Sequence, residues 1–590
     1  MSKFWSVAAV SFAAGVGGFG GGASGATIFV DASRMTGAND GTSWANAFQG
    51  RLGLVSALAA ANPGDEVWVA DGVYAPAPAS GDRNLSFAMR DGVAVLGGFA
   101  GDETNAEQRD PALNIAVLTG DLNSNDGPPV VGITPNSDDN SRHVVRFENV
   151  VGAALDGFTV RAGLAEGPGG FVDWCGGNVR VVGGEAALAN CVIENGRAQW
   201  AGGGVAVVQA SATITDCVIR EHRGDNFGSG LAALDESDVL VEDTVFDANY
   251  CGQGAGIYIG TLAFNDPDDI PGAVTILRSV FQDGNGIISS PFGGAIYSDG
   301  GALVARECVF ESNFVQGGGG AMYLRSGSAR VDRCDFVGND APGDGGGAVF
   351  VDGSGGQEAP VLFTNSRFVG NNGAFVVNFA GVLRVVNCSV VNNGIGVPFL
   401  LWPAFFVSPT SAAMIENTIV WGNVTGGTFG SPNINLVGSG TYSLANNVIE
   451  HWTMAMGPGA VGDDPTFVDL DGVDGLLGTD DDDLRLLPGS VARDAGDNAA
   501  LPMEAMLDLI GAARVIDGDN NGAPVVDLGA IEMACLGDAN GDGVVDFGDL
   551  NAVLSVFGAG SGTGADMNFD GAVDFSDLNA VLSAFGADCR

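Results

Sequence analysis

The sequence predicts an all-β protein, a solenoid of short parallel strands, followed by a small helical module. Three observations predict this fold class. A nine-residue pattern recurs between residues 153 and 452, the 590 residues include 95 glycines, and one loop-and-helix segment is written twice, at 537–558 and 565–586. A chain of this length is ample for a sizeable core and for more than one domain.

Composition excludes some classes of partner. Lys and Arg total 24 against 71 Asp and Glu, so the formal charge is −47. Such a surface repels phosphate backbones and anionic lipids, and we expect no nucleic-acid partner. Because only 16% of residues are charged and 46% are hydrophobic, the chain is typical of a packed fold rather than of a disordered acidic one.

The N-terminus predicts an export signal over residues 1–26. Lys3 precedes an apolar stretch, and the small residues Ala23, Gly25 and Ala26 follow it, as at a signal-peptide cleavage site. A membrane anchor is the alternative, but the apolar run is short for a span and no later segment has 18 unbroken apolar residues. We therefore expect an extracellular or cell-surface protein with no transmembrane anchor in the mature chain.

The repeats predict the solenoid. Each repeat has a small or polar residue at its centre, here called the pivot, as in "LANCVIENG" and "ARECVFESN". The interval between pivots varies from 22 to 35 residues, which helical repeats do not tolerate and which loops between stacked strands absorb. The pivots are Cys191, Cys217, Thr244, Ser279, Cys308, Cys334, Ser366, Cys388, Thr418 and Asn447.

Alternation within each repeat predicts which side chains face inward. The second residue after the pivot is apolar in every repeat, with phenylalanine in five successive ones from Phe246 to Phe368, and is expected inside. The third residue after the pivot faces out; it is charged or polar as far as Glu311 and apolar from Val337. Glu194, Arg220 and Asp247 occupy this outer position and predict ion pairs between coils.

Corners and turns also repeat. The fifth residue after the pivot is Asn249, Asn313, Asn339, Asn371, Asn393 or Asn423 in six repeats. We expect these asparagines to take the left-handed conformation at a corner, with their amides bonded from coil to coil. Runs such as "GAGIYI" and "GGGAVF" predict glycine turns that lead into a second strand of each coil.

From about Thr27 to Met533 the chain resembles the secreted right-handed parallel β-helix proteins of the pectate-lyase-like superfold. It most resembles their polymorphic outer-membrane-protein-like repeat branch, found in bacterial surface proteins. The opening "TIFVDASRMTGANDGTSWANAF" and the closing "VVDLGAIEM" carry this likeness together with the repeats. The resemblance implies a β-helix domain over 27–534, but the superfold hosts lyases, glycosidases, adhesins and passive stalks, so it leaves the chemistry open.

One charged stretch is a candidate for chemistry on the β-helix. "REHRGDN" supplies Arg220, Glu221, His222, Arg223 and Asp225, and Asp173 and Trp174 precede it in "GFVDWCGG". A solvated charged corner is the commoner meaning of such a stretch, and we assign no catalytic residue. Sugar binding by ring faces is a further alternative, as is simple packing of the rings; the candidate rings are Trp174, Trp200, Tyr250 and Tyr258.

The cysteines divide into three sets. The five pivot cysteines stand where Thr and Ser also occur, so we interpret them as small core residues rather than metal ligands. Whether Cys175 and Cys251 are paired is left open. Cys535 and Cys589 bracket the duplicated C-terminal segment, and because export permits oxidation we predict a disulfide between them.

The duplicated segment predicts two calcium loops, each opening a helix. A twelve-residue calcium loop needs oxygen side chains at positions 1, 3, 5, 9 and 12, a carbonyl at 7 and glycine at 6. Both copies comply, with Asp at position 12 where EF-hands usually have Glu. The predicted ligands are Asp538, Asn540, Asp542, Val544, Asp546 and Asp549 in the first copy and Asp566, Asn568, Asp570, Ala572, Asp574 and Asp577 in the second.

Residues 535–590 resemble a type I dockerin on the strength of these loops. The resemblance implies docking to a cohesin-like protein. In cellulosomal dockerins, positions 10 and 11 of each loop usually carry a hydroxyl pair that contacts cohesin; here they are Phe547 with Gly548 and Phe575 with Ser576. This difference leaves the partner unidentified, and a purely intramolecular role is the alternative.

A second acidic cluster lies in "DLDGVDGLLGTDDDD". A bound calcium ion and a solvated acidic loop are the two alternatives there. The residues concerned are Asp469, Asp471, Asp474, Asp480 and Asp482.

The sequence as a whole favours a secreted surface or matrix binding protein, with a β-helix for glycan or surface contact and a calcium-dependent attachment module. A polysaccharide lyase or glycoside hydrolase is the alternative.

Overall fold

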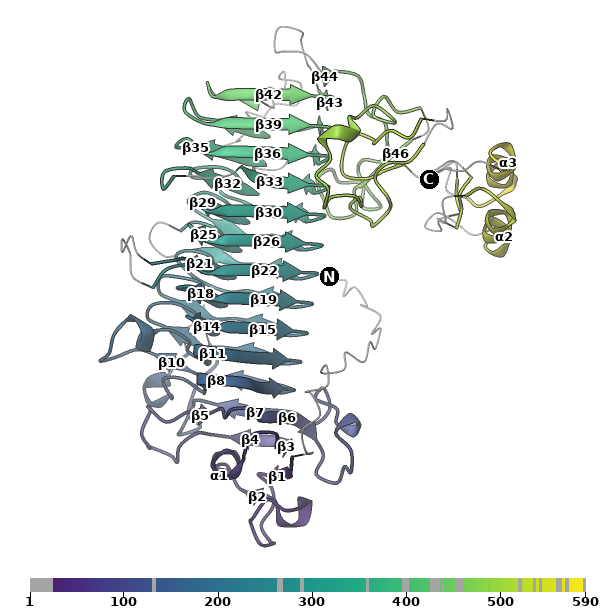
Figure 1. Ribbon diagram of the computed structural model, residues 1–590. Coiled ribbons are helices and arrows are strands. Elements are labelled where there is room, and N and C mark those ends of the chain that lie inside the picture. The colour runs from purple at the N-terminus through teal and green to yellow at the C-terminus, as the bar shows by residue number, and fades with distance from the viewer. Residues whose placement is uncertain are drawn as a thin grey trace.

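The structure is a computed structural model, and its central feature is a long stack of parallel strands (Figure 1). It describes residues 25–586, except 130–133, 263–268, 287–290, 357–359, 395–402, 425–435, 438, 451–459, 488, 518–522, 534–536, 541–543, 559–564 and 568–571. Within this part of the chain, successive coils add strands in the same order along one axis, as Figure 1 shows.

The larger sheet has 25 strands and is called the broad sheet. Most coils contribute two strands to it. They are β1 (Thr27–Asp31), β2 (Phe48–Gln49), β3 (Glu66–Ala70), β5 (Phe87–Ala88), β6 (Ala94–Phe99), β8 (Val145–Asp156), β11 (Val179–Ala189), β14 (Val205–Val208), β15 (Ser211–Thr215), β18 (Leu231–Leu234), β19 (Asp238–Glu242), β21 (Ile257–Gly260), β22 (Ala273–Leu277), β25 (Ile296–Asp299), β26 (Ala302–Arg306), β29 (Met322–Arg325), β30 (Ser328–Asp332), β32 (Val349–Asp352), β33 (Val361–Thr364), β35 (Phe375–Asn378), β36 (Val382–Val386), β38 (Phe405–Val407), β39 (Ala412–Glu416), β41 (Leu436–Val437) and β42 (Thr441–Ala445).

The second sheet has 14 strands and is called the narrow sheet. It contains β4 (Gly72–Tyr74), β7 (Ala116–Thr119), β9 (Phe158–Arg161), β12 (Val192–Glu194), β16 (Val218–Arg220), β20 (Val245–Asp247), β23 (Val280–Gln282), β27 (Val309–Glu311), β31 (Asp335–Val337), β34 (Arg367–Val369), β37 (Ser389–Val391), β40 (Ile419–Trp421), β43 (Asn447–Ile449) and β44 (Ala460–Val461). Short strands form a third side: β10 (Leu164–Ala165), β13 (Arg197–Ala198) and β17 (Arg223–Gly224), then β24 (Asn285–Gly286) and β28 (Phe314–Val315). β45 (Phe467–Asp469) and β46 (Asp483–Leu486) form an antiparallel pair outside the coils.

Helices lie at the two ends of the described chain. α1 (Gly53–Ala60) contacts β1 and β5 and buries Leu54, Ala57 and Leu58 over the first coils. α2 (Phe547–Ser555) and α3 (Phe575–Ser583) belong to the C-terminal module. Short 3₁₀ turns occur at Trp44–Asn46, Ala106–Gln108, Ser137–Asp139, Phe171–Trp174 and Asn498–Ala500. No helix among the described residues is long and apolar enough to cross a bilayer.

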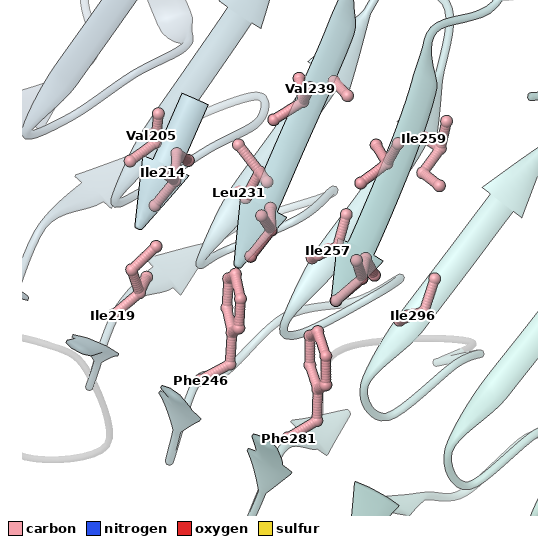
Figure 2. Packing of buried hydrophobic residues seen from close by; sticks show 14 of the residues in the cluster. Val205, Ile214, Ile219, Leu231, Val239, Phe246, Ile257, Ile259, Phe281 and Ile296 are labelled. Carbon is pink, nitrogen blue, oxygen red and sulfur yellow. The ribbon is translucent and has the colours of Figure 1, made fainter. Parts of the chain in front are cut away.

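The interior column expected from the sequence is confirmed. The second residue after every pivot is buried, and the rings of Phe246, Phe281, Phe310, Phe336 and Phe368 stack face to face with centroids 4.6–4.9 Å apart. Figure 2 shows Phe246 and Phe281 on the narrow sheet facing the aliphatic side chains of the broad sheet. Among the described residues, one buried apolar cluster therefore extends from Ile28 in the first coil to Ile449 in one of the last.

The corner asparagines are bonded from coil to coil, as predicted. Asn339 accepts from the Asn313 N–H at 3.1 Å and donates to the Phe310 carbonyl at 2.8 Å. Asn371 does the same for Asn339 and the Phe336 carbonyl, one coil on. Each side-chain amide thus satisfies buried main-chain groups that the two sheets leave unpaired at the corner.

The predicted left-handed conformation of these asparagines is wrong by one residue. The positive φ belongs to the residue before the corner asparagine, for example Ala248, Ser312 and Gly338, with φ of 48°, 54° and 60°. A second left-handed residue stands just before each pivot, for example Glu307 and Arg333. The asparagine at the corner instead provides a side-chain amide that forms hydrogen bonds with the preceding coil.

Glycine turns lead into the broad sheet as expected. Gly319 has φ +72°, and a Cβ there would lie 2.2 Å from the Met322 carbonyl oxygen. Gly254 is equivalent, with φ +66° and the same distance to the Ile257 carbonyl oxygen. A side chain at either position would therefore collide with main chain in a conformation that already disfavours it.

The described residues between 462 and 533, here called the C-terminal strap, fold back along the outside of the narrow sheet. Phe467, Leu484 and Leu528 of the strap pack in one buried cluster with Val337 and Val369 of the coils. This explains why the outer position changes from charged to apolar at Val337. Coils up to Glu311 turn this column to solvent, and later coils turn it to the strap.

Hydrogen bonds and ion pairs also hold the strap against the coils. Arg367 forms an ion pair with Asp335 and donates to the main-chain oxygen of Asp482 at 2.8 Å. Asn417 exchanges hydrogen bonds with the main chain of Asp497, at 2.9 and 3.0 Å. The residue before the pivot is charged from Asp216 to Arg333 and is asparagine from Asn365 onward. This second outer column therefore also changes near the strap.

Candidate functional sites

The C-terminal module consists of two equivalent halves. Val545, Val553, Ala565, Val573 and Val581 form its small core. Two reciprocal main-chain bonds join the halves: Gly558 N–H to the Val573 carbonyl at 2.8 Å and Gly586 N–H to the Val545 carbonyl at 2.7 Å. The duplication in sequence is therefore a pseudo-twofold pairing in space.

Both loops position their last carboxylate in the same way. Asp549 is wholly buried and accepts from the N–H of Asn540 at 3.0 Å and of Asp546 at 2.7 Å. In the second half Asp577 is wholly buried and accepts from Met567 at 2.7 Å and Asp574 at 2.8 Å. Asp546 and Asp574 in turn cap α2 and α3. Each position-12 carboxylate thus ties the start of its loop to the start of its helix.

The remaining predicted ligands are only partly described. Asp538 and Asp566 are buried at the start of the two loops, whereas Asp542, Asn568 and Asp570 lie outside the described residues. Among the residues that are described, no three His, Cys, Asp or Glu side chains form a metal-binding group. The chemistry of the donor set nevertheless fits a hard cation, because every predicted side-chain ligand presents oxygen. Calcium binding stays a prediction.

The two helices bury only some of their apolar side chains. Val553 and Val581 are buried, but Leu554 and Leu582 are 55% and 56% exposed. Phe547 packs edge to face on Phe585, and Phe557 on Phe575, with centroids 5.0 and 5.1 Å apart. Phe547 and Phe575 remain 71% and 73% exposed. Each ring pair therefore joins one phenylalanine from each half, and both pairs are partly exposed to solvent.

The two other predictions near the C-terminus stay untested. Cys535 and Cys589 lie outside the described residues. In the second acidic cluster, Asp482 is buried and accepts from Gly478 N–H at 2.8 Å and from the Asn392 amide at 3.2 Å, which fastens this loop to the coils. Asp469, Asp471, Asp474 and Asp480 are exposed. No metal-binding group forms among these described carboxylates.

The charged stretch "REHRGDN" is divided among three environments. Arg220 points outward from β16 and pairs with Glu194 at 2.7 Å, as the column predicted. Arg223 lies on the third side of the coil, where its Nε is 3.2 Å from Asp225. His222 lies between them and is wholly buried. The structure therefore does not bring these residues together as one catalytic group.

His222 occupies the corner position of its coil, where other coils have asparagine. Its Nδ1 accepts from Gly196 N–H at 2.9 Å, and its Nε2 lies 2.8 Å from the Ile193 carbonyl oxygen. These are the two bonds that a corner amide makes. Burial lowers the pKa of His222 to about 4, so the ring is neutral and its role is structural. His143, also buried, has its pKa lowered by burial to about 3.

Packing accounts for much of the aromatic set. Tyr258 is buried and stacks on Tyr297 at 5.8 Å, and that column continues to Tyr323 and Phe350. Trp174 and Trp200 are half-buried. The buried cysteines are also structural: no disulfide links Cys175, Cys251 or the five pivot cysteines.

A polar cleft of about 290 Å³ opens on the third side of the first coils. Arg197 is paired with Asp225 at 2.8 Å on one wall. A smaller hollow shares Leu164 and Arg197 with it and reaches Asn140 and Asn195. The side-chain oxygens of these two asparagines are buried and accept no hydrogen bond from the described residues. The cleft is lined by Leu164, Glu166, Arg197, Gln199 and Asp225.

A larger groove of about 640 Å³ lies between the coils and the C-terminal strap. The coils contribute two ion-paired arginines, Arg333 with Glu307 at 2.5 Å and Arg367 with Asp335 at 2.6 Å. The strap contributes the apolar Leu509 and Ile510 and a run of acidic residues. The sequence marks this groove only indirectly, through the change of the outer columns next to it.

Comparison with known proteins supports the fold. A family model described as a right handed beta helix region matches residues 171–341. Together with the parallel pairing of the strands, this identifies the chain as an all-β, right-handed parallel β-solenoid. A search of curated proteins found no match.

Several solved structures are distantly similar to this chain. The chain is 14% identical to pectate lyase Pel9A, with 87% of this chain and 98% of that one covered and a TM-score of 0.37. It is 14% identical to the catalytic unit of a GH87 alpha-1,3-glucanase from Streptomyces thermodiastaticus, covering 67% and 64%, with a TM-score of 0.40. An alginate lyase from Paenibacillus sp. is 12% identical, covering 71% and 97%, with a TM-score of 0.26. This likeness concerns fold and not chemistry.

Proposed function

We propose that this protein is a secreted surface or matrix binding protein, in which the β-solenoid carries the contact faces and residues 535–590 attach it through calcium. The observation that supports this most is the equivalence of the two loop–helix halves. Each half buries its position-12 carboxylate, which accepts from the N–H of position 9 and from an N–H at the start of the same loop, and each half contributes one ring to each of the two aromatic pairs. Two independent loops of a mere acidic linker have no reason to share this geometry.

Calcium is the cation that best suits the loops. Asp538, Asp546 and Asp549 supply carboxylate oxygens in the first half, and Asp566, Asp574 and Asp577 in the second, with the Val544 and Ala572 carbonyls at position 7. Bound calcium would supply positive charge that offsets the repulsion among these carboxylates. The core of five small side chains is too modest to hold the halves together against that repulsion.

A protein partner of the cohesin kind is the expected target of the module. Position 10 of each loop, which contacts cohesin in the dockerins that the sequence resembles, carries the exposed Phe547 or Phe575. An exposed aromatic ring beside a second ring and an exposed leucine is typical of the anchor of a protein interface. Position 10 of each loop is thus an aromatic ring where cellulosomal dockerins usually have a hydroxyl.

A second candidate function is polysaccharide binding or cleavage, and the third-side cleft favours it. The cleft carries the paired charges of Arg197 and Asp225, and the smaller hollow beside it contains two buried amide oxygens that accept no hydrogen bond from the described residues. Such oxygens need hydrogen-bond donors, and a ligand rich in hydroxyl groups would supply them.

Calcium removal should unfold the module and spare the solenoid. In the full-length protein, we expect excess EDTA to abolish the circular-dichroism signal of α2 and α3 and to allow proteolysis after Ala534, while the β-signal persists. Asp538→Asn with Asp566→Asn should reproduce this at limiting calcium. Asp471→Asn with Asp474→Asn, in the other acidic cluster, is the matched control. Helices that persist in excess EDTA would show that the loops do not depend on calcium.

Docking should depend on the two exposed rings. Against a panel of recombinant cohesin modules in calcium, we expect Phe547→Ala with Phe575→Ala to weaken binding by roughly 30-fold or more, as loss of an interface anchor does. Phe379→Ala removes a ring that is 55% exposed on the solenoid and should change nothing. Binding that survives the double variant, with calcium affinity intact, argues against the aromatic patch as the docking surface.

The cleft predicts where any glycan contact occurs. With acidic and neutral oligosaccharides as probes, we expect Arg197→Ala to weaken binding roughly tenfold or more, since it removes a charged hydrogen-bond donor. Arg220→Ala, on the neighbouring narrow sheet, is the control. Product analysis of the same mixtures separates binding from cleavage. Failure of every probe to bind, or equal effects of the two variants, would exclude the cleft.

A further inference from the structure

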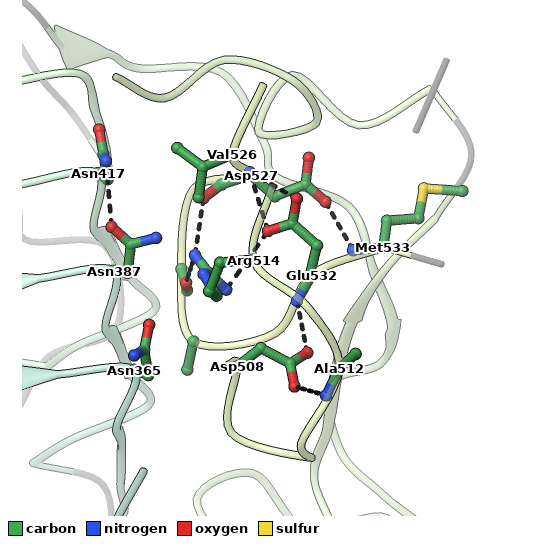
Figure 3. Close-up of polar contacts among 12 residues, drawn as sticks. Asn365, Asn387, Asn417, Asp508, Ala512, Arg514, Val526, Asp527, Glu532 and Met533 are labelled. Carbon is green, nitrogen blue, oxygen red and sulfur yellow. Dashed lines mark hydrogen bonds and ion pairs between the residues drawn. The ribbon is translucent and has the colours of Figure 1, made fainter. Parts of the chain in front are cut away.

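The C-terminal strap carries a buried cluster of charged groups (Figure 3). Asp508, Arg514, Asp527 and Glu532 are between 0% and 4% exposed. The guanidinium of Arg514 lies 3.6 Å from Glu532 and donates to the main-chain oxygens of Asp527 and Gly529 at 3.0 and 2.9 Å. One guanidinium and three carboxyl groups are therefore buried in the same part of the strap.

Main-chain N–H groups complete the cluster. Asp508 accepts from Ile510, Ala512 and Glu532 at 3.0, 2.7 and 2.9 Å. Asp527 accepts from Met533 at 2.7 Å and Asp494 at 2.6 Å, and Glu532 accepts from the N–H of Asp527. These bonds shape the turns of the strap that lie against the coils.

The surroundings supply little further positive charge. Figure 3 shows Asn365, Asn387 and Asn417, which are neutral amides, on the coils beside the cluster. The remaining charged neighbours on the described chain are acidic or already paired. Asp332 accepts from Asn365, Asp494 lies 3.7 Å from Arg493, and Arg384 is paired with Glu416.

Charge balance then makes docking of the strap depend on protons. If all three carboxyls were ionised, one guanidinium would leave two buried negative charges without a cation. The free energy of burying those charges would exceed the stabilisation that the N–H bonds provide. We propose that the C-terminal strap is a proton-dependent closure: it stays docked while the buried carboxyls hold protons and loosens from the coils when they lose them. This device is independent of calcium attachment.

Loosening would change the larger groove. One wall of the groove is lined by Leu509, Ile510, Gly511 and Ile531. The first three directly follow Asp508 in the chain, and Ile531 directly precedes Glu532. Movement of the cluster therefore moves that wall. It also uncovers Val337 and Val369, which the strap now buries.

The direction of the pH dependence follows from burial. Burial raises the pKa of Asp527 from 3.8 to about 6, and it raises the pKa values of Glu532 and Asp508 as well. A carboxyl with a raised pKa binds its proton more tightly in the docked state than in the released one. The stabilisation is therefore complete below the ordinary pKa near 4 and is lost as pH rises through about 6.

Hydrogen exchange of the full-length protein at fixed calcium tests this closure. Gly529 N–H is bonded to the Asn417 carbonyl and Ala530 N–H to Ser389 Oγ, so peptides over 526–533 report docking. After correction for intrinsic exchange, we expect their protection factor to fall at least about tenfold between pH 5 and pH 8, because the proton on Asp527, with a pKa of about 6, contributes about that much on its own. Peptides over the Phe310 strand should not change.

Variants separate the cluster from general pH effects. Glu532→Gln keeps an acceptor for the Asp527 N–H and removes one titrating group, so the fall should become measurably smaller. Asp463→Asn, an exposed strap residue, should keep the full fall. Wild-type protection that is constant from pH 5 to pH 8 would overturn the proposal even if Glu532→Gln fails to fold. So would an unchanged fall in a folded Glu532→Gln protein.

Discussion

The corner of each coil imposes the constraint on which the rest of the structure depends. At the corner the chain leaves one sheet before entering the next, so main-chain groups are buried without a strand partner. A side-chain amide such as Asn313, Asn339 or Asn371 meets this need by bonding to the N–H of the preceding corner and to a carbonyl beside it. Because each amide reaches back one coil, the register of one coil determines that of the next. The stacked phenylalanine column requires that register.

A regular interior leaves the outer columns free to vary. The position three after the pivot is charged where it meets water, as at Glu194 and Arg220, and apolar where it meets the C-terminal strap, as at Val337 and Val369. The residue before the pivot changes from Arg333 to Asn365 one coil later. Binding clefts, strap and groove are thus built on one scaffold by changing outer positions alone.

Periodic features could be predicted from the sequence, and non-periodic ones could not. Pivots, the inward column, the glycine turns and the two C-terminal helices each rest on local spacing, which the structure confirms. The corner conformation was displaced by one residue, because asparagine favours both left-handed turns and amide bonding and the sequence does not separate these roles. His222 lies in the charged stretch that the sequence offers as a candidate for chemistry, yet its column position, five after Cys217, identifies it as a corner residue. The strap has no repeat, so its contacts with Asn417 and Arg367 could not be predicted from the sequence. The change to an apolar residue at Val337 does indicate that something covers the outer column there.

The role of the corner is tested most directly by the free energy of unfolding of two variants of His222. His222→Asn restores the amide that other coils carry and should unfold within about 1 kcal/mol of the wild type. His222→Ala leaves the Gly196 N–H and the Ile193 carbonyl buried without a partner and should lose roughly 2–5 kcal/mol in urea titrations, at about 1–3 kcal/mol for each group. If His222→Ala is as stable as His222→Asn, the corner bonds do not hold the coils together, and the account given above is wrong.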